Sequence, residues 1–305
     1  MSFWELSTQQ AVLFVMILAG AVLAKRGIID DAGQRCLTDL CVNIIIPCNI
    51  IKSCFITFDH SVLRACALVF VVGMAMQLLY VVLNKFLFNR FPEQQKKVLQ
   101  YCTIVSNGGF LGNPVAEGVY GSRGLLYASM FLIPMRVVMW SVGTSYFIAG
   151  ASMDRKKVLR NILTHPCLVA VYVGLLVMVT QVPLPDIVVQ PITHIGNCNS
   201  AITMFIIGTI LSKVDLRTIV TPVSTFFSVF RLALLPAVAF GLCLLLGMDR
   251  VATGVSVIMT GMPAGSTAAI FAARYGSDAP FATKCVVLTT LLSMVTIPLW
   301  CYIVG

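Results

Sequence analysis

The chain is poor in charged residues. Of its 305 residues only 11% are charged, whereas 58% are hydrophobic, and its mean hydropathy is +0.93. A soluble domain carries about 25% charged residues, so this sequence does not fit a single soluble core. Its successive apolar stretches of about 20 residues predict helices that cross a bilayer. We therefore expect an all-α integral membrane protein surrounded by lipid.

The sequence signatures of enzymes and metal sites are also lacking. There is no His-Glu-x-x-His, no Gly-x-Ser-x-Gly and no clustered pair of carboxylates, so nothing supports a membrane enzyme. The eleven cysteines include no Cys-x-x-Cys pair and mostly lie in apolar stretches, which favours small buried side chains over metal ligands or disulfides. The net charge of +9 is spread over loops and does not indicate nucleic-acid binding. We expect no cofactor, no metal and no nucleic-acid partner.

Ten apolar stretches are predicted as spans with short connections. They cover residues 9–24, 37–56, 62–84, 98–120, 124–149, 161–181, 187–212, 219–246, 251–273 and 279–303. Basic residues lie mainly in the loops after the odd-numbered spans, while the alternate loops hold only Arg64, Arg123 and Arg250. The positive-inside rule places the basic loops in the cytoplasm. Both termini are therefore expected on the extracellular or periplasmic side of the cell membrane.

The two halves of the chain show traces of an internal repeat. "VYG" at 119–121 matches "RYG" at 274–276, at the ends of the fourth and ninth spans. We therefore expect two repeats of five spans each, residues 1–150 and 151–305. Because five is odd, the second repeat enters the membrane from the opposite side, and such inverted repeats are typical of secondary transporters.

Two of the predicted spans are interrupted at corresponding places. The fourth contains "SNGGFLGNPV" (106–115) and the ninth contains "TGMPAGST" (260–267). Glycine costs a helix interior about 1 kcal/mol and proline about 3 kcal/mol. Irregular backbone at membrane depth is tolerated only where it lines a cavity or is buried in protein. Paired breaks indicate a substrate site near the midplane; the alternative is two kinks between packed helices without a ligand.

The first break predicts the start of a half-helix. Asn113 is expected as its N-cap and Pro114 as its first residue. The free N–H groups and the positive end of the helix dipole would then point into the cavity and favour an anion. Glu117 falls in the first turn, where it either stabilises the helix end or takes part in coupling to a proton or cation.

Ionisable residues inside spans are costly and functional as a rule. Arg136 and Arg231 lie near the centres of the fifth and eighth spans. Arg136 either binds the anion or forms a structural pair with Glu117 or a backbone carbonyl. The eighth span is expected to pack on the outside of the moving part, so Arg231 is less expected than Arg136 to contact the ligand. Lys52, nearer a span end, is expected to extend to the interface.

Polar side chains also mark one face of the second and seventh spans. Asp39, Asn43 and Pro47 are spaced four residues apart, and Asn199 and Thr203 follow the same spacing in the seventh span. Such stripes serve helix–helix contact in membranes. Lining the substrate path is the alternative, and one face can do both.

Three stretches carry a resemblance to a known family. "SNGGFLGNPVAEGVYG", "GMPAGSTAAIFAARYGSDAPFATKCVVLTTLLSMVTIPLW" and "NIIIPCNIIKSCF" resemble the fourth, the ninth to tenth and the second spans of the auxin efflux carrier family. The resemblance implies a scaffold part (spans one, two, six and seven) and a transport part (three to five and eight to ten). The broken fourth and ninth spans would cross at the substrate. The family's crossover asparagine falls on Asn107 and its ninth-span proline on Pro263.

The resemblance implies a secondary transporter working by alternating access. Its substrate would be a small organic anion, a mono- or dicarboxylate similar to malate, malonate or auxin. The short loop "ASMDRKKVLRN" (151–161) resembles the short prokaryotic branch. A sodium-coupled symporter of the bile-acid type and an anion channel remain alternatives, as does a homodimer formed through the scaffold part. The candidate substrate-binding residues are Asn107, Gly108, Gly109, Asn113, Pro114, Gly261, Pro263, Ser266, Arg136, Asn43, Pro47 and Asn199.

Overall fold

The structure is a computed structural model that describes residues 3–56, 59–143, 145–147, 160, 163–213 and 215–305. The short loop at 151–161 therefore lies almost wholly outside the described residues. The described chain is helical and contains no β-strand, and its helices are joined by short turns.

Fourteen α-helices are described. They are α1 (Phe3–Lys25), α2 (Asp31–Leu40), α3 (Ile46–Ser53), α4 (His60–Asn84), α5 (Glu93–Ile104), α6 (Asn113–Val138), α8 (Pro166–Thr180), α9 (Asp186–Asn197), α10 (Asn199–Ser212), α11 (Pro222–Val229), α12 (Leu235–Leu245), α13 (Arg250–Thr260), α14 (Thr267–Arg274) and α15 (Ala279–Val304). Wider π-helical turns are η1 (Cys41–Ile45), η2 (Gly108–Gly112), η3 (Met139–Gly143) and η5 (Phe230–Leu234), and η4 (Leu216–Thr218) is a 3₁₀ turn.

Six of the described helical stretches are long and apolar enough to cross a membrane. They are Asp31–Ser53, His60–Asn84, Gly108–Gly143, Asp186–Ser212, Pro222–Leu245 and Ala279–Val304. Shorter apolar helices cover Ala11–Lys25, Pro166–Thr180 and Arg250–Thr260. The prediction of a helical membrane protein is confirmed, whereas ten spans in two inverted repeats remain a prediction.

The predicted fourth and fifth spans meet at a sharp turn inside α6. Gly121 has φ 64° and ψ −154°, values outside the helical range, so α6 consists of two helical segments joined at a kink. That backbone conformation is accessible to glycine at little cost. The kink separates the half-helix that starts near the first break from the segment that carries Arg136.

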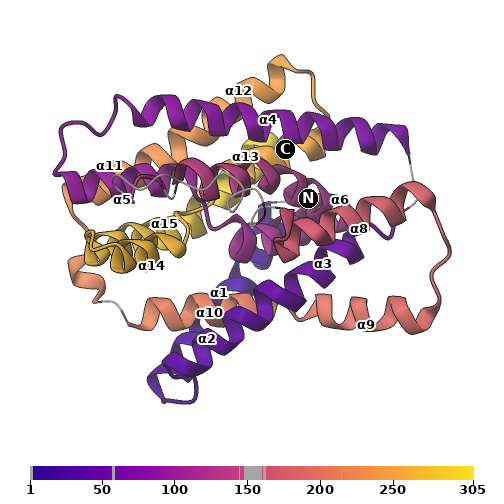
Figure 1. Ribbon diagram of the computed structural model, residues 1–305, viewed down its shortest axis with the longest axis horizontal. Helices are drawn as coiled ribbons and strands as arrows, with labels where there is room; N and C mark the ends of the chain where they lie inside the picture. The colour runs from indigo at the N-terminus through magenta and orange to yellow at the C-terminus, as the bar shows by residue number, and fades with distance from the viewer. Residues whose placement is uncertain (1–2, 57–58, 144, 148–159, 161–162, 214) are drawn as a thin grey trace.

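The helices pack in two groups (Figure 1). In the first, α1 lies along α10, and α3 packs against α8 and α9. In the second, α6 packs against α4 and α13, while α12 lies beside α13 and α14 beside α15. We call them group S (α1–α3 and α8–α10) and group T (α4–α6 and α11–α15). They correspond to the spans expected in the scaffold and the transport part. They meet mainly where α3 contacts α6, α1 contacts α15 and α10 contacts η2.

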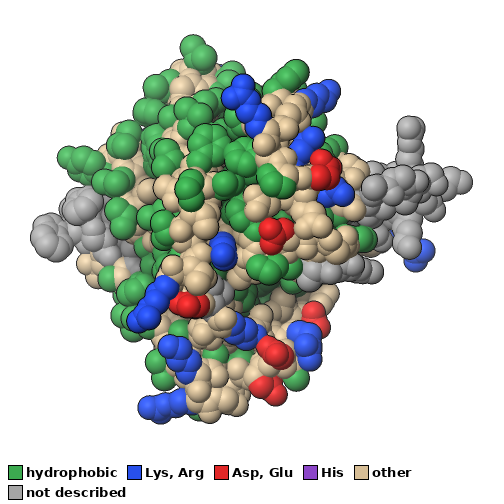
Figure 2. Space-filling model, turned by 90° about the vertical axis from the view of Figure 1, so that its left-hand side faces the viewer, with side chains coloured by type: hydrophobic (Ala, Val, Ile, Leu, Met, Phe, Trp, Pro, Cys, Tyr) green, Lys and Arg blue, Asp and Glu red, His purple; other side chains and the backbone are tan. Residues whose placement is uncertain are grey.

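Apolar side chains cover much of the outer surface. Figure 2 shows a face on which hydrophobic side chains dominate the upper and left areas, while acidic and basic side chains gather toward the bottom and right. Leu78 and Val82 of α4 and Leu176 of α8 are among the exposed large apolar side chains. Extended apolar surface of this kind fits contact with lipid.

Candidate functional site

The two predicted breaks lie against each other in the protein interior. Helices α5 and α13 end at Ile104 and Thr260, and residues 105–107 and 261–266 are not helical. Asn107 N donates to Pro263 O over 2.8 Å, and Gly265 N donates to Val105 O over 2.9 Å. These bonds form an antiparallel bridge between Ser106 and Ala264. Each break thus supplies the hydrogen-bond partners that the other lacks. We call residues 105–107 and 261–266 the crossing.

The close approach between the two non-helical segments of the crossing depends on glycine. A Cβ atom on Gly265 would lie 2.9 Å from Val105 Cγ1, and one on Gly108 would lie 2.7 Å from Leu132 Cδ2. A Cβ atom on Gly109 would meet nothing within 4 Å. The crossing is therefore tightly packed on one side and open beside Gly109.

Arg231 connects both broken helices. Its Nη1 donates to Thr103 O over 2.7 Å and its Nε donates to Met262 O over 3.0 Å. The guanidinium carbon lies 5.7 Å from the ring centroid of Tyr80, a cation–π distance. The side chain is only 1% exposed. The breaks leave these two carbonyls without helical partners, and the forked guanidinium of Arg231 satisfies both.

Two further side chains complete the backbone hydrogen bonding at the crossing. Gln77 of α4 donates its Nε2 to Ile104 O over 3.2 Å. Thr289 of α15 accepts from Ala264 N with its Oγ1 over 3.1 Å. The sequence analysis did not single out either residue. Gln77 carried a signal, since it is an amide in the middle of an apolar span.

The half-helix after the first break starts earlier than predicted. Asn113 is helical, with φ −59° and ψ −51°, and has no capping hydrogen bond. Helical bonding begins in η2, where the N–H groups of Leu111 and Gly112 donate to Asn107 O over 2.9 and 3.3 Å. The prediction of Asn113 as N-cap and Pro114 as first residue is therefore wrong. Asn107 precedes the helix instead, because the wider π turn accommodates the glycines before Asn113.

Several buried amides have polar atoms without a hydrogen-bond partner among the described residues. Both side-chain polar atoms of Asn113 and of Asn199 lack a hydrogen bond among the described residues, as does Oδ1 of Asn49. Asn113 is 0% and Asn199 1% exposed. Asn107 is 4% exposed, and its side chain forms no hydrogen bond within the described structure. An unsatisfied buried polar group costs about 1–3 kcal/mol, so these amides are suited to a ligand or ordered water.

Arg136 is a buried cation with a free nitrogen. It is 6% exposed, and its Nη1 has no partner among the described residues. The preceding residue, Met135, places its Sδ 3.3 Å from Ser106 Oγ, so this part of α6 lies at the level of the crossing. A pair with Glu117, one of the structural alternatives, is not formed. The other two roles that the sequence suggested for Arg136, a structural bond to a backbone carbonyl and anion binding, both stay predictions.

Glu117 is held by α3. Its Oε1 lies 2.8 Å from Lys52 Nζ, and its Oε2 accepts from Asn49 Nδ2 over 3.0 Å. Lys52 Nζ also donates to Asn197 Oδ1 over 2.8 Å. Lys52, which was expected to extend to the interface, thus reaches a carboxylate from another helix; its depth in the membrane remains a prediction.

A cavity of about 300 Å³ lies beside this pair. Helix α1 contributes Val12 and Met16, α6 contributes Pro114 and Glu117, and α10 contributes Ser200. The cavity thus separates parts of groups S and T just after the crossing. Pro114 and Glu117 both lie in "SNGGFLGNPVAEGVYG", the first stretch that resembles the auxin efflux carriers.

The remaining predicted site residues are divided between the crossing and the surface. Gly261 and Pro263 are buried in the crossing, and Ser266 at its end is half-buried. Asn43 is exposed and donates to Asp39 O within its own helix over 2.8 Å. Pro47 is half-buried in α3. No contact brings the last two to the crossing within the described chain, so their role in binding remains a prediction.

The fold and the crossing define a multi-pass membrane protein with two broken helices meeting in its interior. Comparison of sequences shows that the chain belongs to the membrane transport protein family, whose profile matches residues 6–157 and again residues 151–301. This match confirms the resemblance to the auxin efflux carriers and makes the protein a membrane transporter.

Two archaeal relatives align along almost their whole lengths. An uncharacterized transporter of Methanothermobacter thermautotrophicus is 25% identical over 292 residues, which cover 94% of this chain and 95% of that protein. The uncharacterized transporter MJ1031 of Methanocaldococcus jannaschii is 22% identical over 303 residues, covering 96% of each. Their names support transport as the function and do not indicate a substrate.

Proposed function

We propose that the protein is a secondary transporter that carries a small organic anion and binds it at the crossing. The observation that carries this proposal is the pairing of the two broken helices at one buried point. Such a point exposes backbone and side-chain polar groups to a ligand at membrane depth, where intact helices would expose none.

The charges around the crossing favour an anion. Among the described residues the buried charged side chains are Arg136 and Arg231, and no carboxylate is buried with them. Removing a charge from water costs several kcal/mol even after the protein relaxes. A bound carboxylate would neutralise part of this charge and gain hydrogen bonds that are stronger than those between neutral groups.

We infer three groups that would hold the carboxylate. Arg136 offers its free Nη1, and Asn107 offers an amide without a partner in the described structure. Gly109 leaves open space in which a ligand can approach the backbone. Arg231, whose Nε and Nη1 already bond to carbonyls, would act at longer range through its charge.

The packing supports alternating access as the mechanism. Group T contains both broken helices, and group S meets it along a limited set of helices. Movement of group T against group S would carry the crossing between the two sides of the membrane. The groups would serve as the transport part and the scaffold, respectively.

Arg136→Gln tests the proposed binding role. Purified protein is titrated with mono- and dicarboxylates while thermal unfolding and equilibrium binding are followed. Loss of a hydrogen bond to a charged group costs about 1.5–3 kcal/mol, so we expect the dissociation constant to rise about tenfold or more. Arg123→Gln, which removes an exposed arginine from the same helix, should bind as the wild type does.

The outcome separates the alternatives. If Arg136→Gln lowers only the melting temperature and leaves affinity unchanged, Arg136 is structural. Binding that requires sodium would favour the symporter of the bile-acid type. Single-protein conductance far above carrier rates in a bilayer recording would favour an anion channel.

A further inference from the structure

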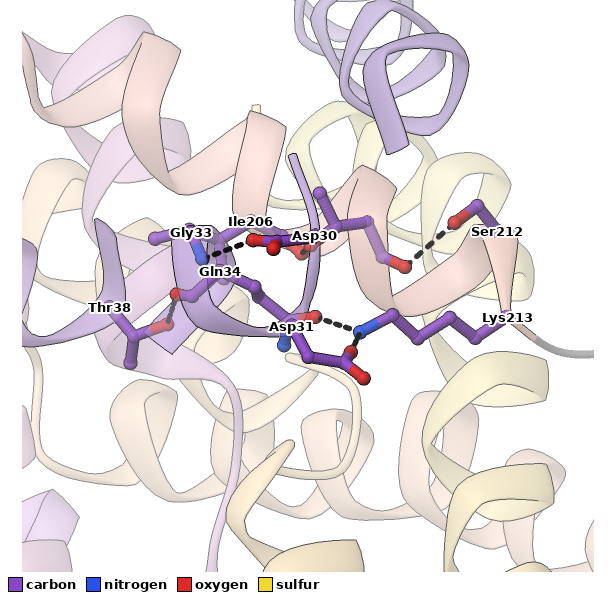
Figure 3. Close-up of polar contacts among 9 residues, drawn as sticks. Asp30, Asp31, Gly33, Gln34, Thr38, Ile206, Ser212 and Lys213 are labelled. Carbon is purple, nitrogen blue, oxygen red and sulfur yellow. Dashed lines mark hydrogen bonds and ion pairs between the residues drawn. The ribbon is translucent and has the colours of Figure 1, made fainter. Parts of the chain in front are cut away.

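One ion pair joins the two groups of helices. Three ion pairs are formed between residues that the structure describes. Lys96 and Glu93 lie within α5, so their pair stays inside group T. Lys213, just after α10, contacts Asp31 at the start of α2 and also Gln34, so this pair stays inside group S (Figure 3). Only Lys52–Glu117 links α3 of group S to α6 of group T.

The Lys52–Glu117 pair is supported from both sides. Glu117 uses both carboxylate oxygens, one toward Lys52 and the other toward Asn49 one turn earlier on α3. Lys52 is itself fixed by Asn197 at the end of α9. The paired side chains are 20% and 22% exposed, so water screens their attraction less than in a fully exposed pair. The carboxylate of Glu117 is thus bound by two side chains of α3, and one of them, Lys52, is also held by α9.

The pair acts on the half-helix that leaves the crossing. Glu117 follows Asn113 by four residues, and side chains at this spacing lie on one face of a helix. One face of α6 therefore carries both the unsatisfied amide of Asn113 and the carboxylate of Glu117, which is bound to Lys52 of group S. Displacement of group T along α3 would separate Glu117 from Lys52 before the half-helix could move far.

The second half of the chain has no equivalent pair. If "VYG" (119–121) corresponds to "RYG" (274–276), the place of Glu117 is taken by Ala272. If Asn43 corresponds to Asn199, the place of Lys52 is taken by Gly208. A Cβ atom on Gly208 would lie 2.1 Å from Ile17 O, so no side chain fits there. The linkage is therefore present on one side of the crossing only.

We propose that Lys52 and Glu117 form a latch that holds group T to group S in the conformation described and must open during transport. The proposal rests on the proposed function, since it assumes that the two groups move relative to each other. A contact present in one conformation and absent from another shifts the equilibrium between them by its own free energy. Because the latch has no counterpart in the other repeat, it favours one of the two access states.

Hydrogen–deuterium exchange without substrate tests the latch directly. Glu117→Gln keeps the side-chain shape and removes the charge, and Lys52→Met removes the partner. We expect each to accelerate exchange several-fold in residues 46–53 and 113–120 and to leave the rest of α6 nearly unchanged. The double variant Lys52→Glu/Glu117→Lys should return exchange toward the wild-type rate, which a merely structural role of either residue would not produce.

Lys213→Met is the matched control. It breaks an ion pair of similar kind within group S, so exchange in residues 46–53 and 113–120 should stay at the wild-type rate. The latch is overturned if both single variants exchange like the wild type in these segments, or if the reversed pair exchanges as fast as the single variants. Anion binding by the wild type tests the proposed function separately, so either idea can fail alone.

Discussion

Arg231 takes over hydrogen bonds that a continuous helix would have made for itself. At the crossing the carbonyls of Thr103 and Met262 both accept from its guanidinium. Arginine suits this position because it presents several donors in a rigid fork, whereas lysine presents one compact charge. The residue therefore holds the geometry of the two breaks and needs no direct contact with substrate.

Replacement of Arg231 should destabilise the protein. Arg231→Met leaves two buried carbonyls without this donor, at about 1–3 kcal/mol each, and should lower the melting temperature in detergent markedly. Arg231→Lys should fall between the wild type and Arg231→Met, because one ammonium cannot reproduce both fork contacts. If Arg231→Met melts at the same temperature as the wild type, the two carbonyls find other partners and Arg231 does not stabilise the crossing.

Gly265 in the crossing and Gly109 beside it should respond differently to replacement by alanine. Gly265→Ala places a methyl group 2.9 Å from Val105 Cγ1, so it should push the breaks apart and cost about 1–3 kcal/mol of stability. Gly109→Ala meets no atom within 4 Å and should fold like the wild type while weakening anion binding, because its methyl group fills the space of the ligand. Thermal unfolding and equilibrium binding of both variants check this. If Gly109→Ala binds the anion with unchanged affinity, the ligand does not occupy the space beside Gly109.

At the scale of the elements, the breaks themselves were predictable and their exact form was not. Glycine and proline at 106–115 and 260–267 predicted both interruptions, and the structure pairs them. The start of the half-helix was misplaced because a π turn keeps residues Gly108–Gly112 helical. Sequence rules for caps assume an ordinary α-helical first turn, and no local pattern announced the wider one.

Long-range partners were the other limit of the sequence. Lys52 and Glu117 are separated by 65 residues along the chain, and Arg231 and Thr103 by 128. Each side chain looked unpaired when its own span was considered alone. Asn107 and Arg136 were proposed as binding groups because of their residue type and depth. The structure adds that both are buried and that Nη1 of Arg136 has no partner in the described chain.

Close helix packing within group S also has a sequence cause. A Cβ atom on Gly20 of α1 would lie 2.5 Å from Phe205 O of α10, and one on Gly208 of α10 would lie 2.1 Å from Ile17 O of α1. Reciprocal small residues let the two backbones approach each other, as is common between membrane helices. The two glycines thus hold α1 closely against α10 within group S, the proposed scaffold.

For the whole molecule, the loop charges predict the orientation in the membrane. A single cysteine at Lys96, introduced after replacement of all eleven native cysteines, should resist an impermeant thiol reagent in intact cells. One at Leu184 should react, because its loop is expected outside. Permeabilised cells provide the control, in which both positions should label. Labelling at Lys96 and protection at Leu184 in intact cells would reverse the predicted orientation.

Equilibrium binding of a carboxylate to Asn107→Ala tests the central claim most directly. Asn107 stands at the crossing and is only 4% exposed, and its backbone N–H is already bonded to Pro263 O. Loss of a hydrogen bond to a charged ligand costs about 1.5–3 kcal/mol, which corresponds to a roughly 10- to 150-fold loss of affinity. Asn89→Ala, at an exposed asparagine of group T, should bind like the wild type. If Asn107→Ala also binds and transports like the wild type at matched expression, the crossing is not the substrate site and the two breaks only pack the helices together.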